Sequence, residues 1–159
     1  MLLHDALRWL YTTPFLKEKV QDGKMEEELL HYFTTQRNAT LPHHNFFDLQ
    51  TAVVQSAFQQ ASHYLIHYYH QRFLPSLSLN EMTIGLEQKL TVQNFSVTID
   101  RLTKKEDTFI IYDYKTNKKL TEEEQQFHRE QLYLYARAVQ ENYGIYFSHL
   151  ECCLEYLAL

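Results

Sequence analysis

The chain has 159 residues, enough for one domain with a core that needs no disulfide to hold it together. Hydrophobic residues make up 45% and charged residues 22%, which is ordinary for a soluble globular protein. The net charge of −5 argues against a free-standing protein that binds nucleic acid without specificity, because such proteins are usually basic. It does not exclude a site built from carboxylates, where a bound cation supplies positive charge.

The two cysteines, Cys152 and Cys153, are neighbours in the sequence and have no third cysteine to pair with. We therefore expect a reducing compartment, a cytoplasmic location and no disulfide framework. Two thiols are also too few for an iron–sulfur cluster or a zinc site built on cysteines. The sequence has no apolar run long enough to span a membrane and no signal-peptide pattern, so no membrane partner is expected.

The first half of the chain has the apolar spacing of helices. Three are predicted: one that ends before Pro14, one over residues 24–33, and a longer one that ends before Pro75. Apolar residues three or four apart share one face of a helix, and that face is expected to be buried. The predicted buried stripes are Leu3, Ala6, Leu7 and Leu10; Met25, Leu29 and Phe33; and Val54, Phe58, Ala61, Leu65 and Tyr68.

Alternation of apolar and polar residues then predicts three strands, Met82–Val92, Phe95–Thr103 and Thr108–Lys115. Gln93-Asn94 separates the first two strands as a tight turn, which favours a hairpin. The third strand contains Phe109–Tyr112, a run that is apolar on both faces. Such a run indicates a central position in a sheet.

A last helix and a last strand are predicted from their boundaries. Thr121 and Glu124 have the spacing of a capping box, so a helix begins there. It runs to about Asn142, and Gly144 ends it. Residues 146–157 then form the last strand.

The order of elements is helices, three strands, a helix and a strand. It predicts an α/β fold in which helices flank a mixed central sheet, with an N-terminal helical region. We expect a single domain over residues 1–159, with a helical part at 1–75 and a sheet core at 82–159.

Candidate chemistry is concentrated at the end of the third strand, in Asp113-Tyr114-Lys115. Residues two apart in a strand point to the same face, so Asp113 and Lys115 lie side by side, about 6–7 Å apart along the strand. Asp100 comes from the strand expected to pair with this one, and Glu87 from the strand before that. Alone, an aspartate and a lysine two apart are a weak signal, and a solvent-facing ion pair is the alternative. For Glu87 the alternative is a charge on an edge strand.

Three carboxylates and one ammonium group that converge from adjacent strands predict a divalent cation. Without one, the carboxylates repel each other and are expensive to bury. Mg²⁺ prefers oxygen ligands, uses one or two carboxylates and leaves positions for water and phosphate. Such an ion polarises a phosphate and activates a bound water, while Lys115 orients that water or offsets charge in the transition state. The pattern therefore indicates phosphodiester hydrolysis.

The order and spacing of these residues resemble the RecB-family branch of the PD-(D/E)xK nucleases. The resemblance covers residues 82–139 and implies a restriction-endonuclease-like core. The matching pieces are Glu87, Asp100-Arg101-Leu102, Asp113-Tyr114-Lys115-Thr116 and Gln131-x-x-x-Tyr135.

The resemblance also implies a role for each residue. The implied ligands of Mg²⁺ or Mn²⁺ are Asp100, Asp113 and the main-chain carbonyl of Tyr114. Lys115 would be the catalytic lysine, and Glu87 would join the site from the first strand. Gln131 and Tyr135, one helical turn apart, would brace the site or contact DNA. The alternative for these two is an ordinary place on the surface and in the core of the helix.

Near the N-terminus, His4 resembles the helical histidine that adds a metal ligand in this branch, and a surface histidine is the alternative. The glycine that usually precedes that histidine is not within this sequence. Ile99 stands where the superfamily's nominal motif has proline, a replacement that is common in this branch. The cysteines that hold an iron–sulfur cluster in some relatives are absent, so no such cluster is predicted.

The resemblance implies a metal-dependent DNA nuclease in repair or recombination, with DNA as substrate and a helicase or another repair-complex subunit as partner. It leaves open whether the action is that of an endonuclease or an exonuclease. The alternative is a non-catalytic nucleic-acid-binding or assembly module that retains the nuclease fold. The acidic balance favours that alternative, and the intact set of Asp100, Asp113 and Lys115 opposes it. A small-molecule hydrolase would need a nucleophile motif such as G-x-S-x-G, which is missing.

Several histidines could be considered as ligands of a second metal ion. His63 and His67 lie four apart, on one face of the third predicted helix. The glutamate of an H-E-x-x-H motif does not accompany them, so they predict a polar helix face.

Overall fold

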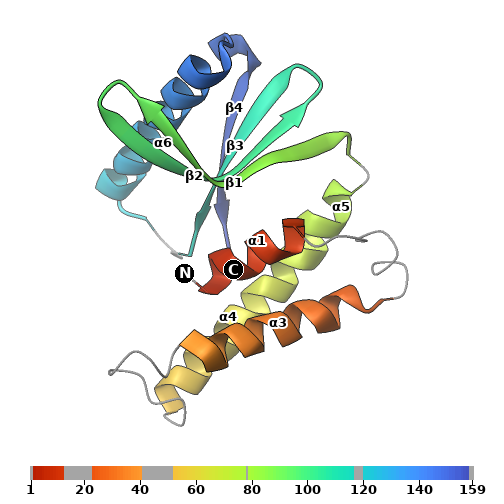
Figure 1. The fold of residues 1–159 in the computed structure, drawn as a ribbon. Coiled ribbons are helices and arrows are strands. Elements are labelled where there is room, and N and C mark those ends of the chain that lie inside the picture. Colours follow the sequence, from red (N-terminus) through yellow and green to blue (C-terminus); the bar gives the residue numbers. More distant parts are fainter. Residues whose placement is uncertain (1, 13–22, 41–51, 78, 117–119, 158–159) are drawn as a thin grey trace. The chain divides into compact units, whose positions relative to one another are not determined.

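The structure is a computed structural model that describes residues 2–12, 23–40, 52–77, 79–116 and 120–157. The chain forms two compact units, the helical unit Met1–Pro75 and the sheet unit Ser76–Leu159 (Figure 1). That the two make up a single nuclease domain stays a prediction. Among the described residues, no helix has the length and apolar character that crossing a membrane requires.

Three helices account for most of the described part of the helical unit: α1 (Leu2–Thr12), α3 (Met25–Thr40) and α4 (Ala52–Tyr68). Each of them packs against the other two. The stripes predicted for the first two helices are confirmed, apart from Leu3, which is only half-buried. Their fully buried members are Ala6, Leu7, Leu10, Met25, Leu29 and Phe33.

The second helix is longer than the sequence predicted. Its expected end at Phe33 is wrong, because the helix continues to Thr40. The prediction stopped at the last apolar residue, whereas the polar extension is held by a contact with α4. The guanidinium group of Arg37 lies 4.0 Å from the ring centre of Phe58, and that ring stacks on Phe33 at 4.8 Å.

The third helix changes its phase before Pro75. α4 leads into a π-helical turn, Tyr69–Phe73, in which the carbonyl of Tyr69 accepts from the N–H of Leu74. The short helix α5 (Leu74–Ser76) follows, so Pro75 lies within the helical run and its expected place beyond the end is wrong. A proline ring crowds the turn before it, and the wider π turn relieves that crowding. The stripe predicted for this helix is buried only in its second half: Val54, Phe58 and Ala61 are partly exposed, and the buried residues are Tyr64, Leu65, Tyr68, Tyr69 and Phe73.

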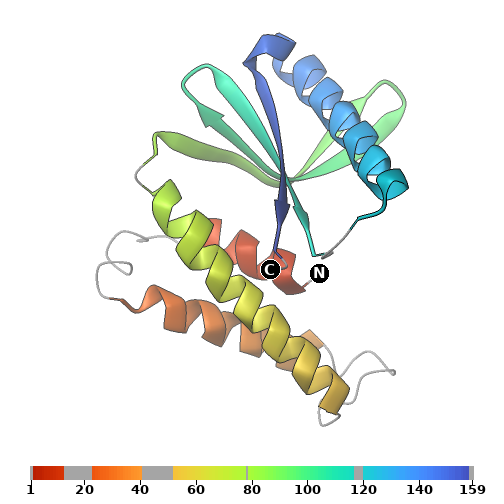
Figure 2. The same cartoon turned by 180° about the vertical axis from the view of Figure 1, so that it is seen from behind.

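The sheet unit contains a sheet of four strands in the order β1-β2-β3-β4 (Figures 1 and 2). The strands are β1 (Glu81–Val92), β2 (Phe95–Lys105), β3 (Thr108–Lys115) and β4 (Leu150–Tyr156). β3 has a neighbour on each side, as its apolar run predicted. The first three strands are antiparallel neighbours and β4 is parallel to β3, which confirms the mixed sheet. A parallel pair requires a crossover connection, and the helix α6 provides it.

Three strands have bounds that differ from those predicted; β1 begins one residue earlier, at Glu81, and β4 ends one residue earlier, at Tyr156. β4 begins at Leu150 rather than at residue 146, because Phe147–His149 forms a 3₁₀ turn. The ring of Phe147 stacks against Tyr133 of α6 at 6.3 Å, a contact that alternation within the strand could not reveal. β2 continues to Lys105, so the following turn is shorter than expected and places Glu106 at a φ of 55°.

The helix α6 (Glu122–Tyr143) begins and ends as predicted. At its start, Thr121 Oγ1 accepts from the N–H of Glu124 at 3.2 Å, and Glu124 Oε2 accepts from the N–H of Thr121 at 2.8 Å. This reciprocal pair is the capping box. At its end, Gly144 has a φ of 64° and its N–H bonds to the carbonyl of Gln140. Glycine adopts this left-handed conformation without strain, so the end of α6 is fixed as well.

α6 packs along one face of the sheet (Figures 1 and 2). The buried residues between helix and sheet come from all of these elements except β4. They are Leu90, Val92, Ile99, Leu102, Phe109, Ile111, Tyr135, Ala136, Ala138 and Val139.

On the opposite face of the sheet, polar contacts connect β1 to β2 and β3. Glu81 Oε1 accepts from the hydroxyl groups of Thr103 on β2 and Tyr112 on β3. The Nε of Arg101 donates to Thr83 Oγ1 at 3.0 Å, and its guanidinium group lies 4.7 Å from the ring centre of Tyr112. Arg101 is only 4% exposed, so these contacts are shielded from water and hold the strands in register.

Removal of the cap of α6 should destabilise the protein without changing its fold. We expect Thr121→Ala to lower the free energy of unfolding by about 1 kcal/mol, because the N–H of Glu124 loses its acceptor. Thr121→Ser retains a hydroxyl group and should stay close to the wild type. Urea unfolding followed by circular dichroism measures the difference; equal losses in both variants would contradict a contribution of the cap.

Candidate active site

Asp113 and Lys115 lie side by side at the end of β3. Lys115 Nζ is 2.9 Å from Asp113 Oδ2, and the two side chains are 17% and 6% exposed, respectively. The pair is therefore not the solvent-facing ion pair that the sequence left open. An ion pair with so little access to water is more strongly coupled than one on the surface.

Asp100 meets this pair at the point where β2 and β3 diverge. The pairing of the two strands ends at Arg101 opposite Tyr112, and one step further the register places Asp100 opposite Asp113. Beyond this point, the N–H of Tyr114 donates to Asp100 Oδ2 at 2.9 Å, where a regular strand pair would offer a backbone carbonyl. Side chains at opposed positions of neighbouring strands share a face, so the two carboxylates lie on the same side of the sheet.

Two residues of α6 complete the group from above this face. Gln131 Oε1 accepts from Lys115 Nζ at 3.2 Å. Tyr135 is 9% exposed, and burial, together with the negative charges of Asp113 and Asp100, raises the pKa of its hydroxyl group to about 12. Both carboxylates therefore lie near this phenol, which keeps its proton and can donate a hydrogen bond. Among the described residues, the structure thus brings together Asp100, Asp113, Lys115, Gln131 and Tyr135.

The oxygen atoms at this point suit a hard divalent cation. The N–H of Tyr114 points away from β4 toward Asp100, and in an extended strand the carbonyl of the same residue points to the same edge. Asp113 Oδ2 is shielded from solvent and makes no hydrogen bond of normal geometry with any residue of the described ranges; Lys115 Nζ lies 2.9 Å from it. Two carboxylates and a carbonyl form an oxygen donor set of the kind that Mg²⁺ and Mn²⁺ use.

Glu87 occupies a strained position on β1. It lies between the pairs that Leu86 and Gln88 make with β2, and the register places it opposite Asp100. Its φ of 45° is unusual for a glutamate and marks an irregular point of the strand. Its side chain is exposed. The backbone of Glu87 is thus next to the site, and the part of its carboxylate in the chemistry stays a prediction.

The irregularity at Glu87 coincides with a break in the alternation of β2. Ile99 and Leu102 are three residues apart, yet both belong to the buried cluster beneath α6. In a regular strand, residues three apart face opposite sides. Asp100 keeps the face of Leu102, two residues away, so the break falls between Asp100 and Ile99, opposite Glu87.

His4 belongs to the other compact unit. It lies in α1 and is half-buried, and its role as a metal ligand stays a prediction. His70 of the same unit pairs with Glu26 at 2.8 Å, and His63 and His67 are exposed. Within the described ranges, no group of three histidine, cysteine, aspartate or glutamate side chains is arranged to hold a metal ion.

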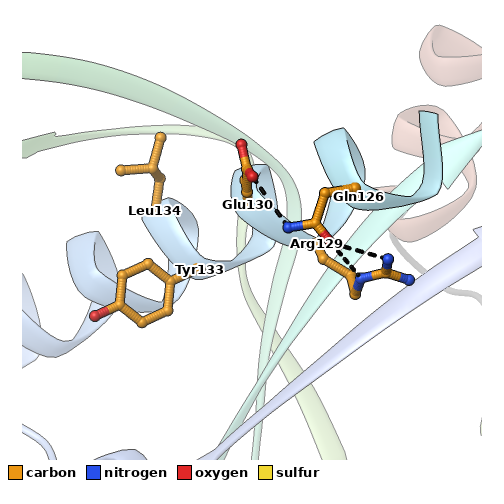
Figure 3. A pocket seen from close by; sticks show the side chains of 5 residues that line it. All are labelled: Gln126, Arg129, Glu130, Tyr133 and Leu134. Atoms are coloured by element: carbon orange, nitrogen blue, oxygen red, sulfur yellow. Dashed lines mark hydrogen bonds between the residues drawn. The ribbon is translucent and has the colours of Figure 1, made fainter. Parts of the chain in front are cut away.

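The outer side of α6 carries a hollow that is separate from this site. It is lined by Gln126, Arg129, Glu130, Tyr133 and Leu134 (Figure 3). With about 100° per residue, these positions lie on the side of the helix opposite to Gln131 and Tyr135. Gln126 bridges Arg129 and Glu130 there through side-chain hydrogen bonds. The hollow therefore has no part in the group of carboxylates.

One residue that the sequence reasoning passed over lies on the same side of α6 as the site. His128 precedes Gln131 by three residues and Tyr135 by seven, so the three share one helical face. Its Nδ1 is shielded from solvent and has no hydrogen-bond partner among the described residues. The spacing from Gln131 could have revealed it.

Comparison with known proteins agrees with this geometry. The family model described as the PD-(D/E)XK nuclease superfamily matches residues 1–150. The chain belongs to this superfamily. Its members are usually metal-dependent nucleases, and the mixed sheet with flanking helices is the restriction-endonuclease-like fold that the sequence predicted.

Among solved structures, this chain is similar to an XisH family protein from Nostoc punctiforme PCC 73102, with 13% identity and a TM-score of 0.33. The similarity covers 46% of this chain and 56% of the XisH family protein. The chain therefore spans little more than half the length of that protein. A search of curated proteins found no match.

The side chain of Asp100 should stabilise the pairing of β2 with β3 in addition to carrying a negative charge. We expect Asp100→Ala to unfold more easily than Asp100→Asn by about 1–3 kcal/mol, because alanine leaves the N–H of Tyr114 without its acceptor and asparagine does not. Asparagine also removes the repulsion with Asp113, so it should equal or exceed the wild type when divalent cations are chelated. Urea unfolding in the presence of a chelator measures all three proteins. Equal stability of the two variants would show that the bond contributes nothing.

Tyr135 should make the protein sensitive to alkali. The unfolded chain releases this proton near pH 10, whereas the folded state holds it to about 12. Between these values the unfolded state binds fewer protons, so the free energy of unfolding falls as the pH rises. We expect Tyr135→Phe to reduce this fall, and Tyr146→Phe, at a residue that is 77% exposed, to leave it unchanged. Urea midpoints measured at several values between pH 9 and pH 11.5 would test this, and an unchanged slope in Tyr135→Phe would contradict it.

Proposed function

We propose that the protein is a metal-dependent DNA nuclease that hydrolyses phosphodiester bonds at the site of Asp100, Asp113 and Lys115. The supporting observation is that two opposed carboxylates and an ammonium group meet at the divergence of β2 and β3, and that Asp113 and Lys115 have little access to water. Membership of the PD-(D/E)XK nuclease superfamily supports the same reaction class.

The ligands of the ion are part of the proposal. Asp100, Asp113 and the carbonyl of Tyr114 would hold Mg²⁺ or Mn²⁺, with Glu87 and His4 as further candidates. When bound, such an ion polarises the phosphate and lowers the pKa of a coordinated water.

The residues around the ligands have separate tasks. The ammonium group of Lys115, held between Asp113 and Gln131, orients the attacking water and donates to the charge that develops on the phosphate. Gln131 accepts one hydrogen bond from Lys115 and so limits the directions in which this side chain can point. Tyr135 keeps its proton and is available as a neutral donor near the two carboxylates.

The finer assignment comes from the resemblance to the RecB branch. The sequence Asp100-Arg101-Leu102, the sequence Asp113-Tyr114-Lys115-Thr116 and the pair Gln131 and Tyr135 carry that resemblance. On this basis DNA is the substrate, the process is repair or recombination, and a helicase or another subunit of a repair complex is the partner. Such a partner would also supply the grip on phosphate that a chain with a net charge of −5 lacks.

Activity is tested with labelled single- and double-stranded DNA in the presence of Mn²⁺ or Mg²⁺. We expect the wild type to cut at least one of these substrates, and Lys115→Ala to lose about 100-fold or more of the rate. Lys105→Ala removes an exposed lysine of the same unit and should retain full activity. Cleavage that persists in Lys115→Ala would show that the reaction does not use this lysine.

A second measurement separates the nuclease from a non-catalytic module that retains the fold. We expect the wild type to bind Mn²⁺ in a calorimetric titration, and Asp113→Asn to lose this binding because a coordinating charge is removed. A wild type that neither binds the ion nor cuts DNA would favour the non-catalytic module.

A further inference from the structure

One face of α6 is turned toward the sheet between Gln131 and Asn142. Gln131 accepts from Lys115 on β3, Tyr135 is buried near Asp113, and Asn142 donates to the carbonyl of Thr91 on β1 at 2.8 Å. With about 100° per residue, these three side chains fall within a narrow sector of the helix. His128 falls within the same sector, at the end of the helix where the capping box lies.

The position of His128 along the site follows from two contacts between α6 and β3. The ring centres of Tyr143 and Phe109 are 5.2 Å apart, and Gln131 contacts Lys115. Twelve helical residues cover about 18 Å and six strand residues about 20 Å, so the two elements run alongside each other in opposite directions. Tyr135 is then level with Asp113. His128 lies about 4.5 Å beyond Gln131, past the ammonium group of Lys115.

The state of the ring follows from its surroundings. Within the part of the chain that the structure describes, Nδ1 is shielded from solvent and has no hydrogen-bond partner, whereas the residue as a whole is partly exposed. A shielded N–H without an acceptor is rarer and more costly than a shielded acceptor without a donor. The neutral ring therefore carries its proton on Nε2, the nitrogen at its outer end.

We infer that His128 binds the DNA backbone by donating a hydrogen bond from Nε2 to a non-bridging oxygen of the phosphate next to the one that is cut. This inference rests on the proposed nuclease function and extends the site beyond Lys115. The two carboxylates by themselves repel an anionic substrate. His128 lies away from them, past Lys115, where it would donate to the neighbouring phosphate. Hydrogen-bond donors of this kind fix the register of a nucleic acid without reading its sequence.

Substitutions at this position distinguish the two ring nitrogens. The amide nitrogen of glutamine reaches about as far as Nε2, and that of asparagine about as far as Nδ1. We expect His128→Ala and His128→Asn to raise the KM for a short DNA substrate about tenfold, with kcat within about twofold of the wild type. His128→Gln should recover most of the wild-type KM. His149→Ala removes a histidine that pairs with Asp107 elsewhere in the same unit, and it should change neither constant.

Binding is measured separately, so that the result does not depend on cleavage. The probe is a fluorescent single-stranded oligonucleotide with Ca²⁺ in place of Mn²⁺; anisotropy reports the affinity, and a gel confirms that the probe stays intact. We expect His128→Ala to bind about tenfold more weakly than the wild type, with an unchanged melting temperature. A wild type that binds in this way but does not cut would overturn the proposed nuclease and leave the contact of His128 supported.

Four outcomes overturn the inference. They are an unchanged KM in His128→Ala while the wild type cuts DNA, a loss confined to kcat, recovery by asparagine rather than glutamine, and no binding of the probe by the wild type. The first of these leaves the nuclease assignment intact.

Discussion

The arrangement of the site depends on the hydrogen bond between the N–H of Tyr114 and the carboxylate of Asp100. At this point β2 leaves β3, and a backbone group that would have bonded to the neighbouring strand bonds to a side chain instead. The bond satisfies a polar group that is expensive to leave unpaired. It also fixes Asp100 opposite Asp113, although two carboxylates at such positions repel each other. The fold therefore contributes the energy that holds these two like charges close together, which is what the proposed cation site requires.

The site also depends on the orientation of the helix α6. Gln131 and Tyr135 must face Lys115 and the carboxylates, which demands a defined rotation and a defined start of the helix. The capping box at Thr121 and Glu124 fixes the first turn. The left-handed Gly144 fixes the last one. With both ends defined, burial of one helical face sets the rotation, so local sequence signals at the two ends determine which side chains reach the site.

Much of this could be read from the sequence because the signals are local. The strand with Asp113 and Lys115, the capping box and the terminal glycine are each encoded within a few residues, and all were predicted correctly. The extension of α3 to Thr40 and the late start of β4 were missed, because each depends on a contact with another element. The site too was only partly predictable. Spacing places Asp113 beside Lys115, but the hydrogen bond of Asp100 to the N–H of Tyr114 and the positive φ of Glu87 arise only when the strands pair.

The charges of the site explain why neutral donors are important in it. The chain carries a net charge of −5, and its candidate ligands are carboxylates, so long-range attraction does not draw a polyanion to this surface. In the proposed nuclease, recognition would then depend on short-range groups that bind phosphate once it is near. Lys115 is charged, but its contacts with Asp113 and Gln131 already use part of its capacity. Burial, together with the charges of Asp113 and Asp100, raises the pKa of Tyr135 further above neutrality, so its hydroxyl group remains a neutral donor next to the carboxylates.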